Sequence, residues 1–225
     1  LPASETFHFR AGQYIDVLMK DGRRRAFSLA NTPNPEGLLE LHVRHVPGGA
    51  FTDFVFQKLA VGDLLRIEGP QGNFRFHEDT GRPMLMVAGG TGLAPVKGII
   101  EHALELGFTL PIKLFWGVRA RRDLYLDEAM EKLAREHGHI AYTPVLSAPH
   151  PDDQWQGRTG YVHEVVLQDV ERLEDYDIYV CGPPAMVEAA GKALVAAGAS
   201  PDHLYSDAFE YAADTLRAIR ESRPG

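Results

Sequence analysis

The sequence predicts two structural units: a small antiparallel β-barrel over residues 1–80 and an α/β unit over residues 81–214, followed by a tail at 215–225. Two observations predict this division. Short strand patterns separated by Pro-, Gly- and Asn-rich turns fill the first third of the chain, which is typical of a small barrel. After residues 81–83, apolar runs alternate with amphipathic helical patterns, which is typical of a doubly wound parallel sheet covered by helices on both faces.

The individual elements follow from the same patterns. In the first unit we expect strands at residues 14–19, 26–30, 38–45 and 64–68 and a short helix at 51–59. In the second unit we expect strands at residues 84–88, 112–116, 140–146 and 176–180, and helices ending near residue 106 and covering 127–137, 161–167 and 185–197. The chain begins without methionine, at residues that read like the end of a strand. We therefore expect a piece of a longer protein whose barrel lacks its first strand.

Composition excludes several classes of protein. The net charge of −8 argues against general binding of nucleic acids or anionic membranes, since both attract basic surfaces. The sequence has no run of about 18 apolar residues, so we expect no membrane span and a cytoplasmic location. Cys181 is the single cysteine, which excludes an internal disulfide and an all-cysteine iron–sulfur cluster within this sequence. The histidines form no His-Glu-x-x-His pattern, and we expect no metal site.

The strongest local signal is a glycine-rich turn between a strand and a helix. The sequence of residues 86–95 is MVAGGTGLAP, so an apolar strand runs into Gly90, Thr91 and Gly92 before a helix begins. Glycines allow the backbone to approach a phosphate closely, and the first helical turn supplies free N–H groups. The spacing is not the usual G-x-G-x-x-G. Phosphate binding is favoured over the alternative, a tight turn without a ligand.

A second signal lies at the end of another expected parallel strand. The sequence of residues 180–186 is VCGPPAM, and ligands of open α/β sheets bind at the carboxyl ends of the strands. Free cysteine is commonly buried, so Cys181 taken alone is best interpreted as a small core residue. Its place at a strand end, followed by Gly182 and Pro183, favours a functional role.

A third signal lies in the first unit, where residues 23–30 read RRRAFSLA. Arg25 offers the fork geometry that suits phosphate, and Phe27 lies two residues on, on the same face of a strand. Ser28 has a hydroxyl that can hydrogen-bond at the edge of a flat ring. Taken alone, this segment is better interpreted as a solvated basic turn that leads into an ordinary strand.

Together these signals resemble the ferredoxin–NADP reductase superfamily over nearly the whole chain. Residues 25–28 (RAFS) are similar to its Arg-x-Tyr-Ser flavin motif, and residues 48–52 (GGAFT) to its flavin-phosphate loop. Residues 69–74 (GPQGNF) are similar to the loop that closes the barrel, and residues 206–209 (SDAF) to an ending of flavin reductases. Within the superfamily, the chain most resembles oxygenase reductase components, CDP-6-deoxyhexulose reductases and NAD(P)H:flavin reductases. The resemblance implies a Greek-key flavin-binding barrel followed by a nicotinamide-binding domain.

The resemblance also implies roles for particular residues. Arg25 would contact the flavin phosphate, Phe27 would pack on the isoalloxazine, and Ser28 would hydrogen-bond near N5. The remaining flavin contacts would come from His42, Val43, Arg44, Gly49, Thr52 and Phe209. The nicotinamide dinucleotide would lie against Gly90, Thr91, Gly92, Cys181, Gly182 and Pro183. Ser28 and Cys181 would tune the contact between the two rings, and Asp207 would assist proton delivery or charge balance.

The expected cofactors are FAD, favoured over FMN, and NADH, favoured over NADPH. Residues 146–153 offer acids and no arginine for a 2′-phosphate, which favours NADH. Arg119, Arg121 and Arg122 keep NADPH open, although a solvated loop that pairs with Asp123 and Asp127 is an equal interpretation. A [2Fe–2S] cluster is expected only if it lies on a segment outside this sequence.

The predicted function is a flavin-dependent NAD(P)H oxidoreductase that passes electrons to an acceptor. The acceptor stays open among a ferredoxin or other iron–sulfur domain, an oxygenase, free flavin and a sugar intermediate bound to a partner. One alternative is an electron-transfer subunit that binds both cofactors but turns over only with its partner. A degenerate domain without flavin is disfavoured by Arg25, Ser28 and the glycine-rich turn.

Overall fold

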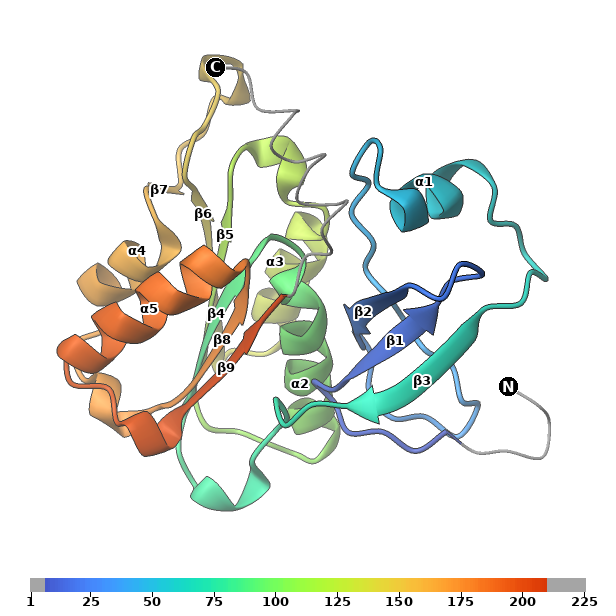
Figure 1. The fold of residues 1–225 in the computed structure, drawn as a ribbon. Helices are drawn as coiled ribbons and strands as arrows, with labels where there is room; N and C mark the ends of the chain where they lie inside the picture. The colour runs from blue at the N-terminus through green and yellow to red at the C-terminus, as the bar shows by residue number, and fades with distance from the viewer. Residues whose placement is uncertain (1–6, 210–225) are drawn as a thin grey trace.

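Two separate β-sheets organise the described part of the chain (Figure 1). The structure, a computed structural model, describes residues 7–209. The first sheet is antiparallel, with the strand order β2-β1-β3, and the second is a parallel sheet in the order β7-β6-β5-β4-β8-β9. This is the predicted fold class, with an antiparallel unit preceding a parallel α/β unit. The predicted tail at 215–225 lies outside the described residues.

The antiparallel sheet consists of β1 (Tyr14–Leu18), β2 (Arg24–Ser28) and β3 (Arg66–Gln71), with helix α1 (Ala50–Gln57) beside it. Strand β1 is central and pairs with both neighbours, so Tyr14 lies opposite Ser28 on one side and Gln71 on the other. Ile15 and Val17 are buried, whereas the other three residues of β1 are only partly buried. This alternation has the period of two that is expected of a sheet with one covered face.

The expected strand at residues 38–45 is wrong, because this segment forms only an isolated bridge between Leu41 and Leu29. Side chains take the backbone groups that a ladder would use. The amides of Asn31 and Asn34 donate to the carbonyl of Leu38 at 2.9 and 2.8 Å, and Asn31 Oδ1 accepts the N–H of Glu40 at 2.8 Å. Such local side-chain bonds compete with regular strand pairing.

The parallel sheet is built from strands that alternate with helices. Its strands are β4 (Met84–Gly89), β5 (Ile112–Val118), β6 (Ile140–Leu146), β7 (Arg158–Thr159), β8 (Asp177–Gly182) and β9 (Leu204–Ala208). Its helices are α2 (Leu93–Glu105), α3 (Asp127–Glu136), α4 (Val162–Asp169) and α5 (Pro184–Ala196). The predicted strands and helices of this unit are confirmed within a few residues. Strands β7 and β9 had no counterpart in the sequence prediction.

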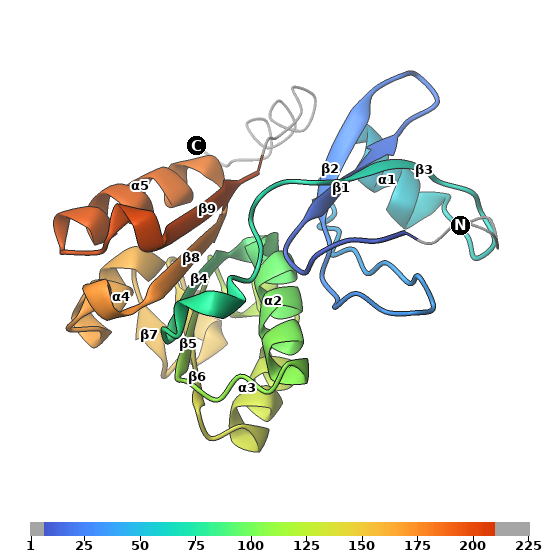
Figure 2. The ribbon, with the colours of Figure 1, turned by 90° about the horizontal axis from the view of Figure 1, so that it is seen from below.

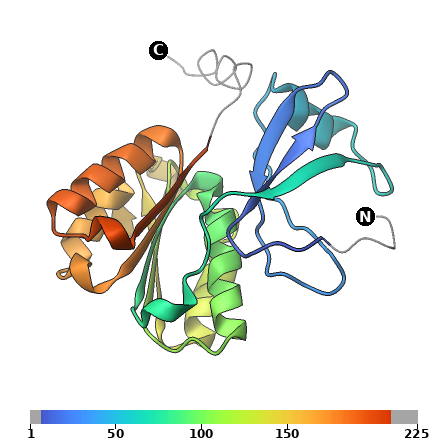
Figure 3. The same cartoon turned by 60° about the horizontal axis from the view of Figure 1, so that its bottom comes forward.

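Helices cover both faces of the parallel sheet. Met84, Met86 and Ala88 of β4 share a buried cluster with residues of α2 and α3, whereas Leu85 and Val87 share another with α4 and α5. Figures 2 and 3 show the two helix pairs on opposite sides of the sheet. All six residues of β4 are buried, which explains their continuous apolar sequence.

Helix α2 lies between the two sheets (Figure 2). Gly98 permits this packing, since a Cβ at this position would lie 3.2 Å from the carbonyl oxygen of Asn31. Next to it, Lys97 Nζ donates to the carbonyl of Ala30 at 3.1 Å and lies 3.4 Å from Glu40 Oε2. The segment after β2 is therefore held directly against α2. Among the helices of residues 7–209, none is both long and apolar enough to span a membrane.

Candidate functional site

The glycine-rich turn lies at the carboxyl end of β4, where Gly90–Gly92 form a short 3₁₀ helix that leads into α2. Gly90 has a φ of +56°, and within residues 7–209 no atom outside its two chain neighbours lies within 4 Å of the position that a Cβ would take. No side chain caps the N-terminus of α2. The turn therefore offers open space beside first-turn N–H groups, which is the arrangement that phosphate needs.

The two sequence motifs of the second unit lie in contact. A Cβ on Gly92 would lie 2.2 Å from the carbonyl oxygen of Cys181 and 3.0 Å from the Cα of Gly182. Strands β4 and β8 are neighbours, with Ala88 opposite Cys181. The absence of a side chain at Gly92 thus allows the end of β8 to pack against the turn after β4.

These loops lie at the topological switch point of the sheet. From β4 the chain adds β5, β6 and β7 on one side, and then returns to place β8 and β9 on the other. The connections that leave β4 and β8 diverge, and open α/β sheets bind ligands in the resulting crevice. The topology independently selects the same strand ends as the sequence motifs.

Strand β9 brings two further predicted residues to this edge. Asp207 lies opposite Cys181 in the register of β8 and β9, and Phe209 N–H donates to the carbonyl of Gly182 at 3.0 Å. In Figures 1 and 3, β9 ends on the side of the parallel sheet that faces the antiparallel sheet. Burial raises the pKa of the Asp207 carboxyl. Cys181 is fully buried, and its pKa is raised well above the ordinary value by burial and by the Asp207 charge.

The predicted flavin strand is β2. Phe27 packs on Phe51 of α1, with ring centroids 5.0 Å apart, and Arg25 lies two residues away on the same face of β2. Arg25 and Phe27 are both partly buried. This face of β2 is therefore turned towards α1, the helix that follows the predicted phosphate loop.

Hydrogen bonds from nearby side chains stabilise the predicted phosphate loop at residues 48–52. Thr52 Oγ1 donates to the carbonyl of Val46 at 2.8 Å, so its hydroxyl already stabilises the turn before α1. Gly49 is the N-cap of α1 and receives no side-chain cap. Asp53 accepts hydrogen bonds from Gly48 N–H and His45 at 3.0 and 2.9 Å. Sequence reasoning missed this carboxylate, although its place in the first turn of the helix could have indicated it.

Residues 42–44 contact the second unit. His42 Nδ1 lies 2.7 Å from the hydroxyl of Tyr125, and Arg44 Nη2 lies 4.0 Å from Asp123 Oδ1. The His42 side chain is only 10% exposed. The structure thus brings His42 and Arg44 to the junction between the units, with Val43 between them. Sequence reasoning gave no signal for Tyr125.

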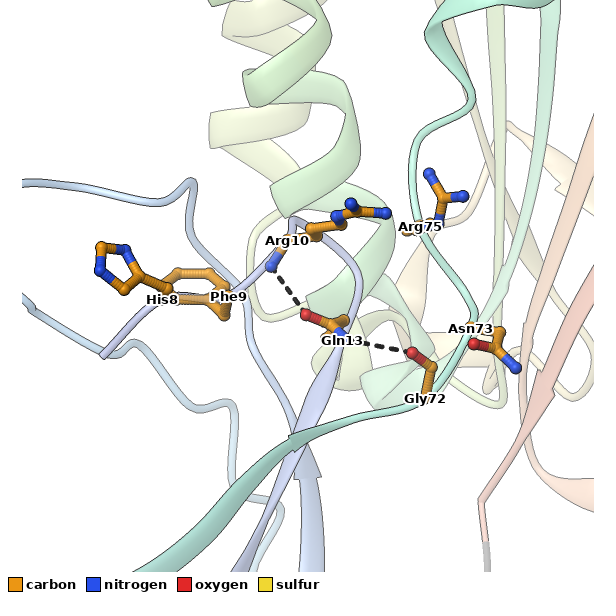
Figure 4. Close-up of a pocket in the computed structure, with 7 residues that line it drawn as sticks. All are labelled: His8, Phe9, Arg10, Gln13, Gly72, Asn73 and Arg75. Atoms are coloured by element: carbon orange, nitrogen blue, oxygen red, sulfur yellow. Dashed lines mark hydrogen bonds between the residues drawn. The ribbon is translucent and has the colours of Figure 1, made fainter. Parts of the chain in front are cut away.

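A cavity of about 310 Å³ lies beside the antiparallel sheet (Figure 4). Its lining residues are His8, Phe9, Arg10, Gln13, Gly72, Asn73 and Arg75. Gln13 ties its two walls together by accepting from Arg10 N–H and donating to the carbonyl of Gly72. The lining has two arginines and no carboxylate, so it suits an anionic or polar group. These residues come from segments about 60 positions apart, and sequence reasoning placed only Gly72 and Asn73 in a motif.

The described residues contain no group of three or more His, Cys, Asp or Glu side chains placed to hold a metal ion. The structural features that fit a ligand are the open space at Gly90 and the uncapped N-termini of α1 and α2. Both suit phosphate groups, and Arg25 adds a charged donor on the face of β2 from which Phe27 packs on α1. The residues present therefore fit two nucleotide cofactors, one in each unit.

Comparison with protein families agrees with this division. Residues 1–76 match the family model described as an oxidoreductase FAD-binding domain, and residues 86–192 match the oxidoreductase NAD-binding domain. The chain thus contains an FAD-binding and an NAD-binding oxidoreductase domain, and its fold is ferredoxin reductase-like. The predicted resemblance is confirmed.

Two curated relatives illustrate the range of these oxidoreductases. The chain is 41% identical over 209 residues to the CDP-6-deoxy-L-threo-D-glycero-4-hexulose-3-dehydrase reductase of Yersinia pestis. It is 39% identical over 207 residues to the ferredoxin–NAD(P)⁺ reductase component of the naphthalene 1,2-dioxygenase system of Pseudomonas putida. These matches cover 93% and 92% of this chain but 62% of each relative. The chain therefore spans less than two thirds of their length.

A solved structure supports the fold. The crystal structure of an Amycolatopsis cytochrome P450 reductase superimposes with a TM-score of 0.84 at 40% sequence identity. The match covers 92% of this chain and 62% of that reductase. The ferredoxin reductase-like fold thus extends over both units.

Proposed function

We propose that the protein is an NAD(P)H-dependent flavoprotein reductase that binds FAD in the antiparallel unit and NAD(P)H at the ends of β4 and β8. The observation that carries the proposal is the contact of Gly92 with Cys181 and Gly182 at the switch point, with the end of β9 beside them. When bound, the flavin would supply the redox chemistry, taking a hydride from the reduced nicotinamide and passing electrons on.

In this proposal the protein's residues bind and orient the cofactors. Arg25 and the uncapped N-terminus of α1 would hold the flavin phosphates, and Phe27 would support one face of the flavin ring. Gly90, Thr91 and Gly92 would bind the pyrophosphate of the nicotinamide dinucleotide at the N-terminus of α2. The catalytic contribution is mainly positioning, since oriented reactants avoid much of the entropic cost of their encounter.

The end of β8 and β9 would complete the site. Ser28 would donate a hydrogen bond at the edge of the flavin ring, and Phe209 would cover its second face. Cys181 would border the nicotinamide as a neutral thiol, because its buried environment disfavours the thiolate. Asp207, whose pKa burial raises, is suited to hold a proton near this contact.

We propose that NADH is preferred over NADPH. The strand-end loop after β5 carries Arg121, whose guanidinium donates to the carbonyl of Asp153 at 3.1 Å. The N–H of Arg121 also lies 3.4 Å from Asp153 Oδ2. The arginine that could receive a 2′-phosphate is thus held by an acidic segment, which disfavours a second anion there.

The electron acceptor is proposed from the relatives. The Pseudomonas putida relative is named as the reductase component of a dioxygenase system, and the Yersinia pestis relative as a reductase for a hexulose dehydrase. An iron–sulfur domain, a ferredoxin or an oxygenase is accordingly the proposed acceptor class, with free flavin as another. Because NAD(P)H is regenerated inside the cell, we place the reaction in the cytoplasm.

The first experiment is reconstitution with FAD followed by anaerobic titration with NADH and NADPH. The proposal expects saturable FAD binding and loss of the flavin absorbance on addition of NADH. Flavin that binds but is not reduced would instead support the partner-dependent subunit. Failure to bind FAD at all would contradict both the reductase and the partner-dependent subunit.

A further inference from the structure

A chain of contacts links the antiparallel unit to the nucleotide-binding turn. The Tyr125 ring meets His42 edge-on, with centroids 5.3 Å apart, and its hydroxyl lies 2.7 Å from His42 Nδ1. The same ring meets Trp116 edge-on, with centroids 5.2 Å apart and planes at 90°. Trp116 Nε1 in turn donates to the carbonyl of Gly90 at 2.8 Å. Tyr125 therefore lies between a residue of the first unit and the residue that fixes the turn.

Hydrogen bonds join Glu40, His42 and Tyr125 at the first-unit end of this series of contacts. His42 Nε2 lies 2.8 Å from Glu40 Oε1. Burial acts to raise the pKa of Glu40, but hydrogen bonds and charges from His42 and Lys97 outweigh it and lower the pKa. Glu40 is thus a carboxylate that accepts a hydrogen bond from Nε2–H of His42. The Tyr125 hydroxyl, whose pKa is raised by burial and by the charge of Glu40, remains protonated and hydrogen-bonds Nδ1, the other ring nitrogen of His42.

Trp116, at the end of this series of contacts, lies in the core. Trp116 is fully buried on β5, opposite Ala88 of β4, so its indole cannot move without disturbing the core. Its N–H holds the carbonyl of Gly90, the residue with a φ of +56° that opens the turn. One packed ring and one hydrogen bond therefore separate Tyr125 from the turn.

We propose that Tyr125 is a positioning residue, which sets the turn at Gly90–Gly92 relative to the antiparallel unit through His42 on one side and Trp116 on the other. The inference rests on the proposed function, because the two linked parts are the proposed flavin and nicotinamide sites. Hydride transfer depends steeply on the distance between the two rings, and a residue that joins their binding sites controls that distance.

The test uses Tyr125→Phe, which removes the hydroxyl and retains the ring on Trp116. Tyr161→Phe is the matched control, since the Tyr161 ring also contacts a histidine ring, that of His163, but is 64% exposed at the start of α4. The first readout is amide hydrogen exchange of residues 89–93 in the flavin-free protein. The second is the limiting rate of flavin reduction by NADH, measured together with NADH and FAD affinity by stopped-flow and titration.

We expect Tyr125→Phe to accelerate exchange at residues 89–93 and to lower the limiting rate roughly tenfold, a fraction of the ~100-fold loss typical of a 1 Å misplacement. FAD affinity should be unchanged, and Tyr161→Phe should behave as wild type in every readout. His42→Ala removes the hydrogen-bond partner of Tyr125 from the other side and should reproduce the effect on exchange. The double variant should add little, because both changes break the same link.

Wild-type exchange in Tyr125→Phe would overturn the proposal. So would faster exchange with an unchanged limiting rate, since the link would then be structural only. The exchange measurement needs no cofactor, so it tests the link even if wild-type protein fails to bind FAD or react with NADH. That failure would reject the proposed function, whereas wild-type exchange in Tyr125→Phe, with normal flavin reduction by the wild-type protein, would reject only the role of Tyr125.

Discussion

Cys181 on β8 lies opposite Asp207 on β9, and this pairing places the chain's single cysteine beside a partly buried carboxyl group. The thiol is fully buried, and burial, followed by the charge of Asp207, raises its pKa. Since the thiolate is the reactive form of cysteine, this environment suppresses its nucleophilicity. The pairing therefore argues against a covalent catalytic role for Cys181.

Cys181 should be unreactive in the native protein. At about pH 8, near the pKa of an ordinary cysteine, a thiol reagent is expected to label it only after denaturation. Labelling can be followed by mass spectrometry with and without denaturant. Rapid stoichiometric labelling of native protein would contradict the environment described. Cys181→Ala should retain reduction by NADH at a lower rate, because no covalent step depends on the sulfur.

Asp207→Asn should stabilise the protein at neutral pH. Burial raises the folded-state pKa of Asp207, so the neutral carboxyl contributes stability at low pH that is lost as pH rises through the folded-state pKa. Asparagine cannot ionise and avoids this loss. Thermal unfolding across pH should show a gain at neutral pH that disappears below the ordinary range of an aspartate, whereas Asp202→Asn at an exposed position should show none. A gain that grows towards acid would contradict the sign.

The Asp207→Asn variant also separates stability from function. If Asp207 holds a proton near the contact of the two rings, flavin reduction by NADH should slow although the protein becomes more stable. A stabilised variant with the wild-type limiting rate would exclude Asp207 from the reaction.

Gly92→Ala should disrupt the contact between β4 and β8. Its Cβ would lie 2.2 Å from the Cys181 carbonyl oxygen, and backbone cannot yield as a side chain can. Overpacking of this kind costs about 1–3 kcal/mol, and NADH affinity should fall with it. Gly191→Ala is the control, because no atom lies within 4 Å of its added Cβ and alanine favours the interior of α5. Denaturant unfolding and NADH titration check both variants. Equal stability and equal NADH affinity of the two variants would contradict the close contact of Gly92 with the end of β8.

Arg25→Lys should weaken FAD binding although it keeps the positive charge. Lysine cannot form the planar fork that suits phosphate, and hydrogen bonds to charged groups contribute about 1.5–3 kcal/mol, which corresponds to roughly 10- to 150-fold in affinity. Arg24→Lys is the control, since Arg24 is exposed and pairs with Glu68 at 2.8 Å. A FAD titration that ranks the two variants equally would argue against Arg25 as a phosphate ligand.

Asp153→Ala should shift nucleotide preference towards NADPH. It removes the carboxylate that accepts from Arg121 N–H and the local negative charge, although the bond from the guanidinium to the backbone carbonyl can remain. The ratio of kcat/KM for NADH to that for NADPH should therefore fall relative to wild type. Asp152→Ala is a neighbouring control, with a carboxylate that contacts only His150 in the described structure. An unchanged ratio would mean that the 2′-position of the adenosine ribose does not bind beside Asp153.

The sequence predicted those parts of the fold that rest on local pattern. The apolar run of β4 and the glycines after it specify a buried strand and an open turn, because both depend on adjacent residues. Strand β9 was missed because Leu204–Ala208 is a partly exposed edge strand, which pairs with β8 alone among the strands of residues 7–209. The segment at residues 38–45 has a strand-like pattern, yet the Asn31 and Asn34 side chains replace its ladder.

Contacts between the units could not be predicted in the same way. His42 and Tyr125 are 83 positions apart, and their hydrogen bond depends on how α2 packs against the segment after β2. Periodicity within either segment has no information on that packing. The candidate residues of the glycine-rich turn, β8 and β9 do lie together, because parallel strands of one sheet necessarily end at the same edge.

The most direct test is single-turnover mixing of FAD-loaded protein with NADH under anaerobic conditions, comparing NADH with NADH deuterated at each face of C4. The account predicts that the flavin absorbance is lost in a single fast phase and that deuterium on one face alone slows this phase. That result would establish direct transfer between two rings held in fixed orientation. No loss of flavin absorbance, or a loss that neither deuterated form slows, would contradict direct hydride transfer from NADH to the bound flavin.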